Sequence, residues 1–276
     1  MEKIYFENTI REFVNSAPGN FVAREIALRP ELAGMRIFEE PLFGYAAADD
    51  PLFSEYKKPG IIGAHFLLPL EWLPEAQTVL SIFFPFTQQI KKANQADMSW
   101  PASEWLHGRI EGQQFQGNIS LYATELLKKD GFAVLVPASD SRFSSKNPLV
   151  QDKSRQDYYT SNWSERHAAY VCGLGTFSLS KGLITAKGIA GRFISLITSA
   201  PFEPGARPYT KFDEYCIRCG ACASNCPAGA ISMEKGKNHP LCSAFIDRTM
   251  EKHKPRYGCG KCQVNVPCES GIPGAR

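Results

Sequence analysis

Eight of the nine cysteines of this chain lie in its last quarter, at spacings that could hold iron–sulfur clusters. The first run has the pattern C-x2-C-x2-C-x3-C-P and consists of Cys216, Cys219, Cys222 and Cys226, followed by Pro227. Three thiolates on one tight loop can hold three corners of a [4Fe-4S] cubane, while the fourth ligates a neighbouring cluster. A structural zinc site would instead use two separated C-x2-C pairs. The first run therefore predicts cubane ligation.

The other four cysteines could complete a second set of ligands. Cys242 stands alone, and Cys259, Cys262 and Cys268 follow, with five residues before the last. If the fourth ligand of each group crosses to the other cluster, two cubanes use all eight thiols. One cluster then takes Cys216, Cys219, Cys222 and Cys268, and the other takes Cys226, Cys242, Cys259 and Cys262. A single cluster with four structural thiols is the alternative.

The composition indicates a globular, cytoplasmic protein. Of the 276 residues, 43% are hydrophobic and 21% charged, so a sizeable core can form. Clustered cysteines are typical of metal binding in a reducing compartment rather than of disulfides. The N-terminus has neither a signal peptide nor a twin-arginine pair, and no apolar run reaches the roughly 18 residues of a membrane span. A formal charge of +3 does not indicate nucleic acid. We therefore expect no membrane attachment.

The elements that must position these cysteines alternate between helix and strand. Helical periodicity predicts a helix over 4–16, and the apolar run 78–86 predicts a strand. A loop rich in Trp, Ser and His is expected over 98–112. A helix over 117–129 should follow, with Asn118 or Ser120 near its N-cap and a lysine pair in its last turn. Residues 132–138 then predict a buried strand.

A long polar stretch precedes the last elements of this part. Residues 139–160 predict an irregular loop, which is usually functional or mobile at this length. Residues 161–172 predict a helix stopped by Gly173, and 182–186 and 192–201 predict two strands. A proline-rich linker and an abrupt change of composition follow. We expect an α+β fold, with an α/β domain over 1–205 and an iron–sulfur domain over 206–276.

One segment resembles a known enzyme family. Glu165-Arg166-His167-Ala168-Ala169 leads to Cys172-Gly173-Leu174-Gly175, then Gly191-Arg192-Phe193, and then the first cysteine run. This order is similar to that of epoxyqueuosine reductase, whose cobalamin-dependent module is shared with reductive dehalogenases. The resemblance implies a nitroreductase-like α/β domain that binds cobalamin, followed by a 2x[4Fe-4S] bacterial ferredoxin-like domain. By the same resemblance, the residues lining the corrin would be Gly173, Leu174, Gly175, Gly191 and Arg192.

The resemblance also implies a reductive reaction on a small-molecule substrate, with ferredoxin or flavodoxin as electron donor. The family's catalytic aspartate falls at Tyr159, beside Tyr158, and the dehalogenase branch uses a tyrosine as proton donor. We therefore expect Tyr159 or Tyr158 to act as the acid. The chain ends at residue 276 without the family's helical-repeat domain, so tRNA is not an expected partner. The alternatives are a corrinoid-free electron-transfer protein and epoxyqueuosine reduction in tRNA.

Other side chains near these motifs have both a structural and a functional interpretation. His107 could contact substrate or cobalt, or be a solvated loop residue. Arg109 could hold an anionic tail, as could Arg192. Cys172 is expected to be a small buried apolar side chain. Core packing is the expectation for the tryptophans in the chemically interesting segments, which are Trp100, Trp105 and Trp163.

Overall fold

A four-stranded antiparallel sheet forms the centre of the computed structural model, which describes residues 1–274. Its strands, in spatial order, are β1 (Leu42–Ala47), β2 (Thr78–Pro85), β6 (Gly191–Thr198) and β3 (Val134–Leu135). β2 pairs with β6 over its whole length, from Thr78 opposite Thr198 to Pro85 opposite Gly191. All eight residues of β2 are buried, because helices cover both faces of the sheet.

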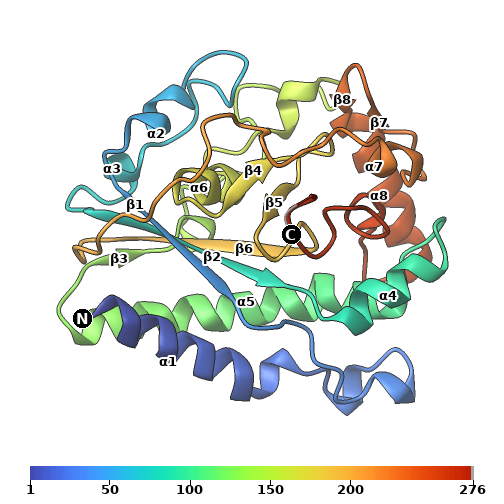
Figure 1. Ribbon diagram of the computed structural model, residues 1–276, viewed down its shortest axis with the longest axis horizontal. Helices are drawn as coiled ribbons and strands as arrows, with labels where there is room; N and C mark the ends of the chain where they lie inside the picture. The colour runs from blue at the N-terminus through green and yellow to red at the C-terminus, as the bar shows by residue number, and fades with distance from the viewer. Residues whose placement is uncertain (275–276) are drawn as a thin grey trace.

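Helices form a layer on each side of the sheet (Figure 1). α1 (Lys3–Ser16) and α5 (Ser103–Lys129) cover one face, while α2 (Pro51–Glu55), α3 (Pro69–Trp72) and α6 (Glu165–Val171) cover the other. Alternate residues of β2 pack against the two helix layers. Leu80 and Ile82 pack with α1 and α5, and Val79 packs with α6, as the two-residue period of a strand requires. The expected α+β fold class is confirmed.

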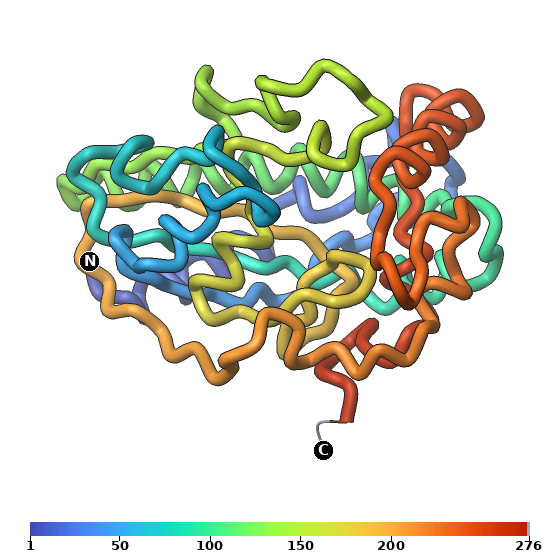
Figure 2. Tube along the Cα trace, turned by 90° about the horizontal axis from the view of Figure 1, so that it is seen from above, coloured from blue at the N-terminus to red at the C-terminus, as the bar shows by residue number. Residues whose placement is uncertain are grey.

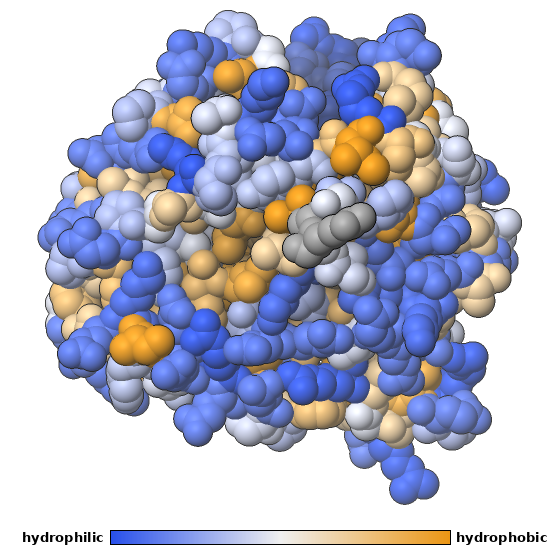
Figure 3. Space-filling model, viewed as in Figure 1, coloured by the Kyte–Doolittle hydropathy of each residue, from blue (hydrophilic) through white to orange (hydrophobic). Residues whose placement is uncertain are grey.

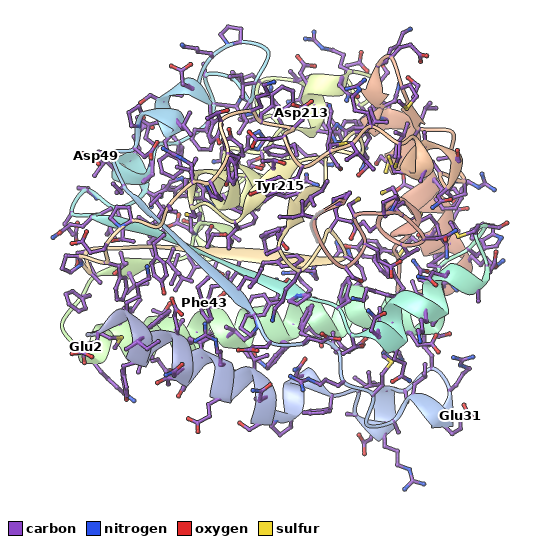
Figure 4. All side chains as sticks on the ribbon, viewed as in Figure 1. Glu2, Glu31, Phe43, Asp49, Asp213 and Tyr215 are labelled. Atoms are coloured by element: carbon purple, nitrogen blue, oxygen red, sulfur yellow. The ribbon has the colours of Figure 1, made fainter. Side chains whose placement is uncertain are left out.

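The cysteine-rich region lies at one end of this sandwich, at the right of Figures 1 and 2. It contains α7 (Ala221–Ser224), a hairpin of β7 (Ile231–Ser232) and β8 (Gly236–Lys237), and α8 (His239–His253). A second hairpin lies beside it, formed by β4 (Gly175–Phe177) and β5 (Leu183–Thr185). α4 (Gln88–Ala96) follows β2 at the same end. Asp213 and Tyr215, labelled in Figure 4, mark the approach to the first cysteine run.

Residues 258–270, here called the C-terminal loop, return from α8 to the sheet domain. The Lys261 ammonium donates to the backbone and side-chain oxygens of Asn94 in α4, at 2.6 and 2.8 Å. The Ile189 amide donates to the Cys268 carbonyl at 2.9 Å, and Val264 is buried in the core that α1 and α5 share. The division at residue 206 remains a prediction, and these contacts tie the two parts together.

The longest helix was placed wrongly from the sequence. α5 begins at Ser103, so residues 103–112 are helical rather than a loop, and Asn118 and Ser120 lie in its interior rather than near its N-cap. The Trp, Ser and His residues of this segment suggested a loop, but the segment is helical and two of its glycines allow close packing. A Cβ on Gly108 would lie 2.8 Å from Phe86, and one on Gly112 would lie 2.9 Å from Phe38. The expected lysine pair does occupy the last turn.

Replacing Gly112 by Ala should destabilise the protein by about 1–3 kcal/mol, because the Phe38 ring cannot move aside. Phe38 is fully buried, and its ring stacks on Phe86 at 5.3 Å. Gly117 of the same helix is the matched control, since a Cβ there meets nothing within 4 Å. Gly117→Ala should stabilise by up to about 1 kcal/mol through helix propensity. Thermal unfolding compares the two variants, and equal melting temperatures would contradict the packing argument.

The other predicted elements agree with the structure more closely. α1 and β2 match the predicted ranges to within one residue. The range 182–186 contains β5, and 192–201 overlaps β6, which begins one residue earlier at Gly191. The strand predicted over 132–138 is only the two-residue, half-buried β3, because it pairs with a single neighbour at the sheet edge. α6 begins at Glu165 rather than residue 161 and ends before Gly173, which has φ +83°.

No helix within residues 1–274 is long and apolar enough to cross a membrane. Polar residues cover most of the face drawn in Figure 3, and hydrophobic residues appear there in small groups.

Candidate functional site

The eight clustered cysteines line two neighbouring hollows, four at each. Cys226, Cys242, Cys259 and Cys262, here called the inner set, line a cavity of about 490 Å³. Cys216, Cys219, Cys222 and Cys268, here called the outer set, line a hollow of about 20 Å³, and Cys219 of this set is exposed. The structure thus brings together the two groups that crossed ligation predicts, including Cys268 with its unusual spacing.

The two sets are in contact through shared packing. Cys222 of the outer set and Cys226 and Cys262 of the inner set belong to one apolar cluster, with Ile184 and Ile231. Burial and the neighbouring thiols raise the pKa of Cys268 to about 12 and that of Cys222 to about 11. Iron must therefore displace protons when it binds these thiols.

Local structure explains how the inner set converges. Cys242 lies in the first turn of α8, which begins where the Asn238 side chain accepts the Leu241 amide. Cys259 is held from the sheet domain, because the Asn94 side chain donates to its carbonyl at 3.0 Å. Within residues 1–274, no three His, Cys, Asp or Glu side chains are grouped to hold a single metal ion. That finding concerns one-ion sites, since the cysteines of a cubane bind different irons.

The inner cavity is strongly cationic. No Asp or Glu is among its described lining residues, and six basic side chains are: Arg109, Lys146, Arg166, Arg192, Lys237 and Lys261. Among the residues described at the outer hollow, one is basic, Arg218. Cations beside a thiolate-ligated cluster stabilise its negative charge. The two cysteine sets therefore lie in different electrostatic environments.

Arg166 lies between the inner cavity and a second, larger one. It lines both the inner cavity and a cavity of about 630 Å³, here called the large cavity. The Arg166 side chain is surrounded by protein, but it is accessible to solvent because a cavity lies on each side of it. Burial lowers its pKa, while the Cys262 and Cys242 thiols oppose that shift, and it forms no ion pair within residues 1–274. Arg166 thus connects the inner set to the large cavity.

Aromatic side chains and two neutral histidines line the large cavity. Tyr56, Tyr170 and Phe177 contribute ring surfaces. Burial and nearby cations lower the pKa of both His167 and His239 to about 3, so both imidazoles are uncharged near neutral pH. The Ser164 hydroxyl lies 2.8 Å from His167 Nδ1 and fixes that ring. These rings offer flat faces to a planar ligand, and the charged lining residues Glu55, Arg166 and Lys181 can contact its polar groups.

Of the two tyrosines predicted to act as the acid, only Tyr159 is among the residues lining the large cavity. Its ring stacks on His239 at 5.9 Å and lies edge-on to Tyr158 at 5.0 Å. The Lys146 ammonium lies 4.4 Å from the centre of the Tyr159 ring. The Tyr159 hydroxyl donates to the Lys153 carbonyl at 3.1 Å.

The five residues predicted to line a corrin fall into two groups. Gly191 and Arg192 line the inner cavity. Leu174 is buried in the core, and a Cβ on Gly173 or Gly175 would strike the backbone oxygen of Ala206 or Ile184. The segment 173–175 lines neither the inner nor the large cavity. Its glycines allow protein backbone, rather than a macrocycle, to approach closely.

His107 is a buried structural residue rather than a loop residue or a ligand contact. It is fully buried in α5, its Nε2 accepts the Leu28 amide, and its Nδ1 lies 2.9 Å from Glu111. Cys172 is buried as expected, and its thiol donates to the Val79 carbonyl. Trp163 and Trp105 are both core residues as expected, and Trp105 also lines the inner cavity.

Comparison with known proteins adds to this geometry. Residues 209–232 match the model of the Fer4 family, a 4Fe-4S binding domain. The structure aligns with epoxyqueuosine reductase from Bacillus subtilis over 98% of this chain and 67% of that one, with a TM-score of 0.55 and 16% identity. The chain has the epoxyqueuosine reductase fold. The structure also aligns with an epoxyqueuosine reductase that was solved with a tRNA-Tyr stem loop. This alignment covers 99% of this chain and 67% of that one, with a TM-score of 0.54 and 18% identity.

Other relatives extend the fold beyond that enzyme. The catabolic reductive dehalogenase NpRdhA aligns with a TM-score of 0.52 and 15% identity, over 84% of this chain and 30% of its own. Epoxyqueuosine reductase of Staphylococcus aureus is 28% identical over 138 residues, which are 46% of this chain and 35% of that protein. The ferredoxin-type protein MauM of Paracoccus denitrificans is 31% identical over 107 residues, which are 38% and 42%. The chain thus spans well under half the length of these two relatives.

The sequence did not reveal several of the side chains that the fold brings together at the two cavities. Arg166 was visible only as part of the resembling segment, and Lys261 as the residue between two cysteines. Lys146 and His239 gave no signal, because they come from an irregular loop and from the start of α8. Their convergence depends on tertiary structure.

Glu165, the residue before Arg166, connects α6 to the sheet through a hydrogen bond with Ser195 of β6. The Trp163 indole donates to the Ser195 hydroxyl at 2.8 Å, and that hydroxyl donates to the Glu165 carboxyl at 2.6 Å. Burial raises the pKa of Glu165 to about 8, although the Ser195 hydrogen bond opposes this shift. The carboxyl is therefore neutral in the folded protein below that pH.

Glu165→Gln should flatten the pH dependence of stability between about pH 4.5 and 8. In the unfolded chain the Glu165 carboxyl ionises at its ordinary pKa, so unfolding releases a proton in this window. Stability should therefore fall as the pH rises, by at most about 1.4 kcal/mol per pH unit. Melting temperatures at several pH values measure the effect. Glu12→Gln on exposed α1 is the control, and the same pH slope in both variants would contradict the expectation.

Proposed function

We propose that this protein is an iron–sulfur oxidoreductase that binds two [4Fe-4S] clusters and a corrinoid, and reduces a small molecule. The observation that carries the proposal is the pair of adjoining four-cysteine sets, of which the inner one reaches the large cavity through Arg166. The fold and the 4Fe-4S family match of residues 209–232 support it.

The order of electron transfer follows from exposure. Cys219 of the outer set is exposed, so the outer cluster is the entry point for a one-electron donor such as ferredoxin or flavodoxin. The inner cluster receives the electron next, because the two sets share one packed core. The ligand that accepts the electron then lies in the large cavity, which Arg166 connects to the inner cavity by lining both.

The aromatic surfaces of the large cavity support the binding of a planar macrocycle such as that of a corrinoid. Tyr56, Tyr170 and Phe177 offer flat faces, and the uncharged His167 and His239 add no charge to the wall. Dehalogenases with this fold carry out B12-dependent dehalogenation. A bound corrinoid would supply a metal that accepts single electrons and reacts with the substrate. The described residues would position it and exclude water.

Tyr159 is the residue we assign to proton donation, because it lines the large cavity beside His239 and under the Lys146 ammonium. Tyr159→Phe should lower the turnover rate about 10²-fold or more, the usual contribution of a general acid. Tyr158→Phe is the matched control and should change the rate little, since Tyr158 does not line that cavity. A loss below about tenfold in Tyr159→Phe would argue against this role.

The corrinoid is tested by purifying the protein without oxygen in the presence of hydroxocobalamin. Absorption bands of the corrinoid should accompany the broad iron–sulfur absorption after gel filtration. Their absence would leave the first rival, an electron-transfer protein, which the match to ferredoxin-type MauM favours. The second rival is epoxyqueuosine reduction in tRNA, since one relative with this fold is seen with a tRNA stem loop. Unchanged queuosine in tRNA of a deletion strain would eliminate it.

A further inference from the structure

The inner cavity is much larger than a cluster requires. Each cysteine set offers four thiols suited to the same kind of cubane, yet the outer hollow measures about 20 Å³ and the inner cavity about 490 Å³. The difference is space that a cluster of the same type does not need. A volume of this order lies within the range of small-molecule pockets.

The charges of the inner cavity are also not balanced by a cluster. Four thiolates on a core of +2 leave about −2 on an oxidised cubane. Six basic side chains line the cavity, and no described carboxylate does. The remaining positive charge would be costly in a partly buried cavity unless an anion occupied it.

Two of these cations, Arg109 and Arg192, lie close to each other. Arg109 and burial together lower the pKa of Arg192 to about 9, burial being the larger cause, whereas for Arg166 the inner thiols act in the opposite direction. The Arg192 guanidinium is held by the side-chain oxygens of Gln113 and Gln116. The Arg109 guanidinium is held by the Tyr257 hydroxyl at 2.9 Å. Neither arginine forms an ion pair within the described residues 1–274.

We propose that the Arg109–Arg192 end of the inner cavity binds a phosphate-type anionic group of a ligand that lies beside the inner cluster. Neutral amide and phenol groups hold the two guanidiniums apart from any carboxylate, which leaves their charge available to a ligand. Paired guanidiniums suit the oxygens of a phosphate group well. The inference rests on the proposed function, because it assumes the inner cluster. The phosphate could belong to a small substrate or to the nucleotide loop of a corrinoid.

The first measurement uses the full-length protein, reconstituted without oxygen, with inorganic phosphate as probe. Iron content is determined first, and about eight irons per chain establish both clusters independently of the anion site. Phosphate is then titrated while the midpoint potential of each cluster is followed by EPR. An added negative charge should lower the potential of the inner cluster and leave that of the outer cluster unchanged.

Arg192→Gln should weaken phosphate binding about tenfold or more, the loss of one charged hydrogen-bonding pair, while iron content stays the same. Arg109→Gln is a second variant that leaves the Gln113 and Gln116 contacts intact. Arg218→Gln at the outer set is the matched control, and it should bind phosphate like the wild type. Equal phosphate affinity in all three variants, or no shift of the inner potential with phosphate, would overturn the proposal.

Two corrinoids distinguish the sources of the phosphate. Cobalamin has a phosphodiester in its nucleotide loop, and cobinamide lacks it. If the site holds that loop, cobalamin should compete with inorganic phosphate and Arg192→Gln should weaken cobalamin but not cobinamide. If it holds a separate ligand, both corrinoids should bind alike in the variant while phosphate binding is still lost. Both results support an anion site and differ only in its occupant.

Discussion

A chain in which Cys226 and Cys242 are both replaced by Ser should retain about four irons instead of about eight. Both residues belong to the inner set, so this variant should lose the inner cluster and keep the outer one. The reciprocal variant, Cys216→Ser with Cys268→Ser, should lose the outer cluster. Iron analysis and EPR of the anaerobically reconstituted proteins measure both effects.

The control for this experiment is Cys172→Ser, because Cys172 is buried outside both sets. It should keep about eight irons even if the protein becomes less stable. The pairing of Cys268 with the first cysteine run is the most specific part of the expectation. If Cys268→Ser removed the same EPR signal as Cys242→Ser, the division into an inner and an outer set would be wrong.

The inner cluster should have the higher midpoint potential of the two. Within residues 1–274, six basic side chains line its cavity and one, Arg218, lines the outer hollow. Nearby positive charge favours the reduced, more negative cluster. Solvent near the exposed Cys219 acts in the opposite sense, but it is one exposed thiol against six cations. The difference would drive electrons from the outer cluster towards the large cavity.

Arg166→Gln should lower the inner potential by about 60 mV, which is a tenfold change in the ratio of reduced to oxidised cluster. Arg166 is the natural choice, because the inner thiols Cys242 and Cys262 act on its charge. Arg218→Gln should shift only the outer potential. Redox titrations followed by EPR separate the two clusters. A higher outer potential in the wild type, or equal shifts of both clusters in Arg166→Gln, would refute the electrostatic argument.

The sequence predicted the cysteine sets well because ligand spacing is local chemistry. The run from Cys216 to Cys226 needs no tertiary information, and the crossed-ligation pattern alone predicted which group Cys242 and Cys268 would join. The strands β2 and β6 were equally visible, since a strand buried on both faces is a continuous apolar run. These features depend on short stretches of chain.

Features that depend on distant partners were not predictable. The content of Trp, Ser and His suggested a loop over 98–112, and only the positions of Phe86 and Phe38 explain Gly108 and Gly112 as sites of close packing within α5. His107 suggested a ligand contact until the Leu28 amide and Glu111 accounted for its ring nitrogens. The cationic lining of the inner cavity is of the same kind, because its members come from segments far apart in the sequence.

The attachment of the C-terminal loop to the sheet domain affects how the protein responds to oxygen. Cys268 and Cys259 both belong to this loop, and their backbone carbonyls accept hydrogen bonds from Ile189 and Asn94. Oxidative loss of a cluster would therefore remove anchors from a segment that also packs Val264 into the main core. A damaged molecule would loosen at its core rather than persist as an intact shell.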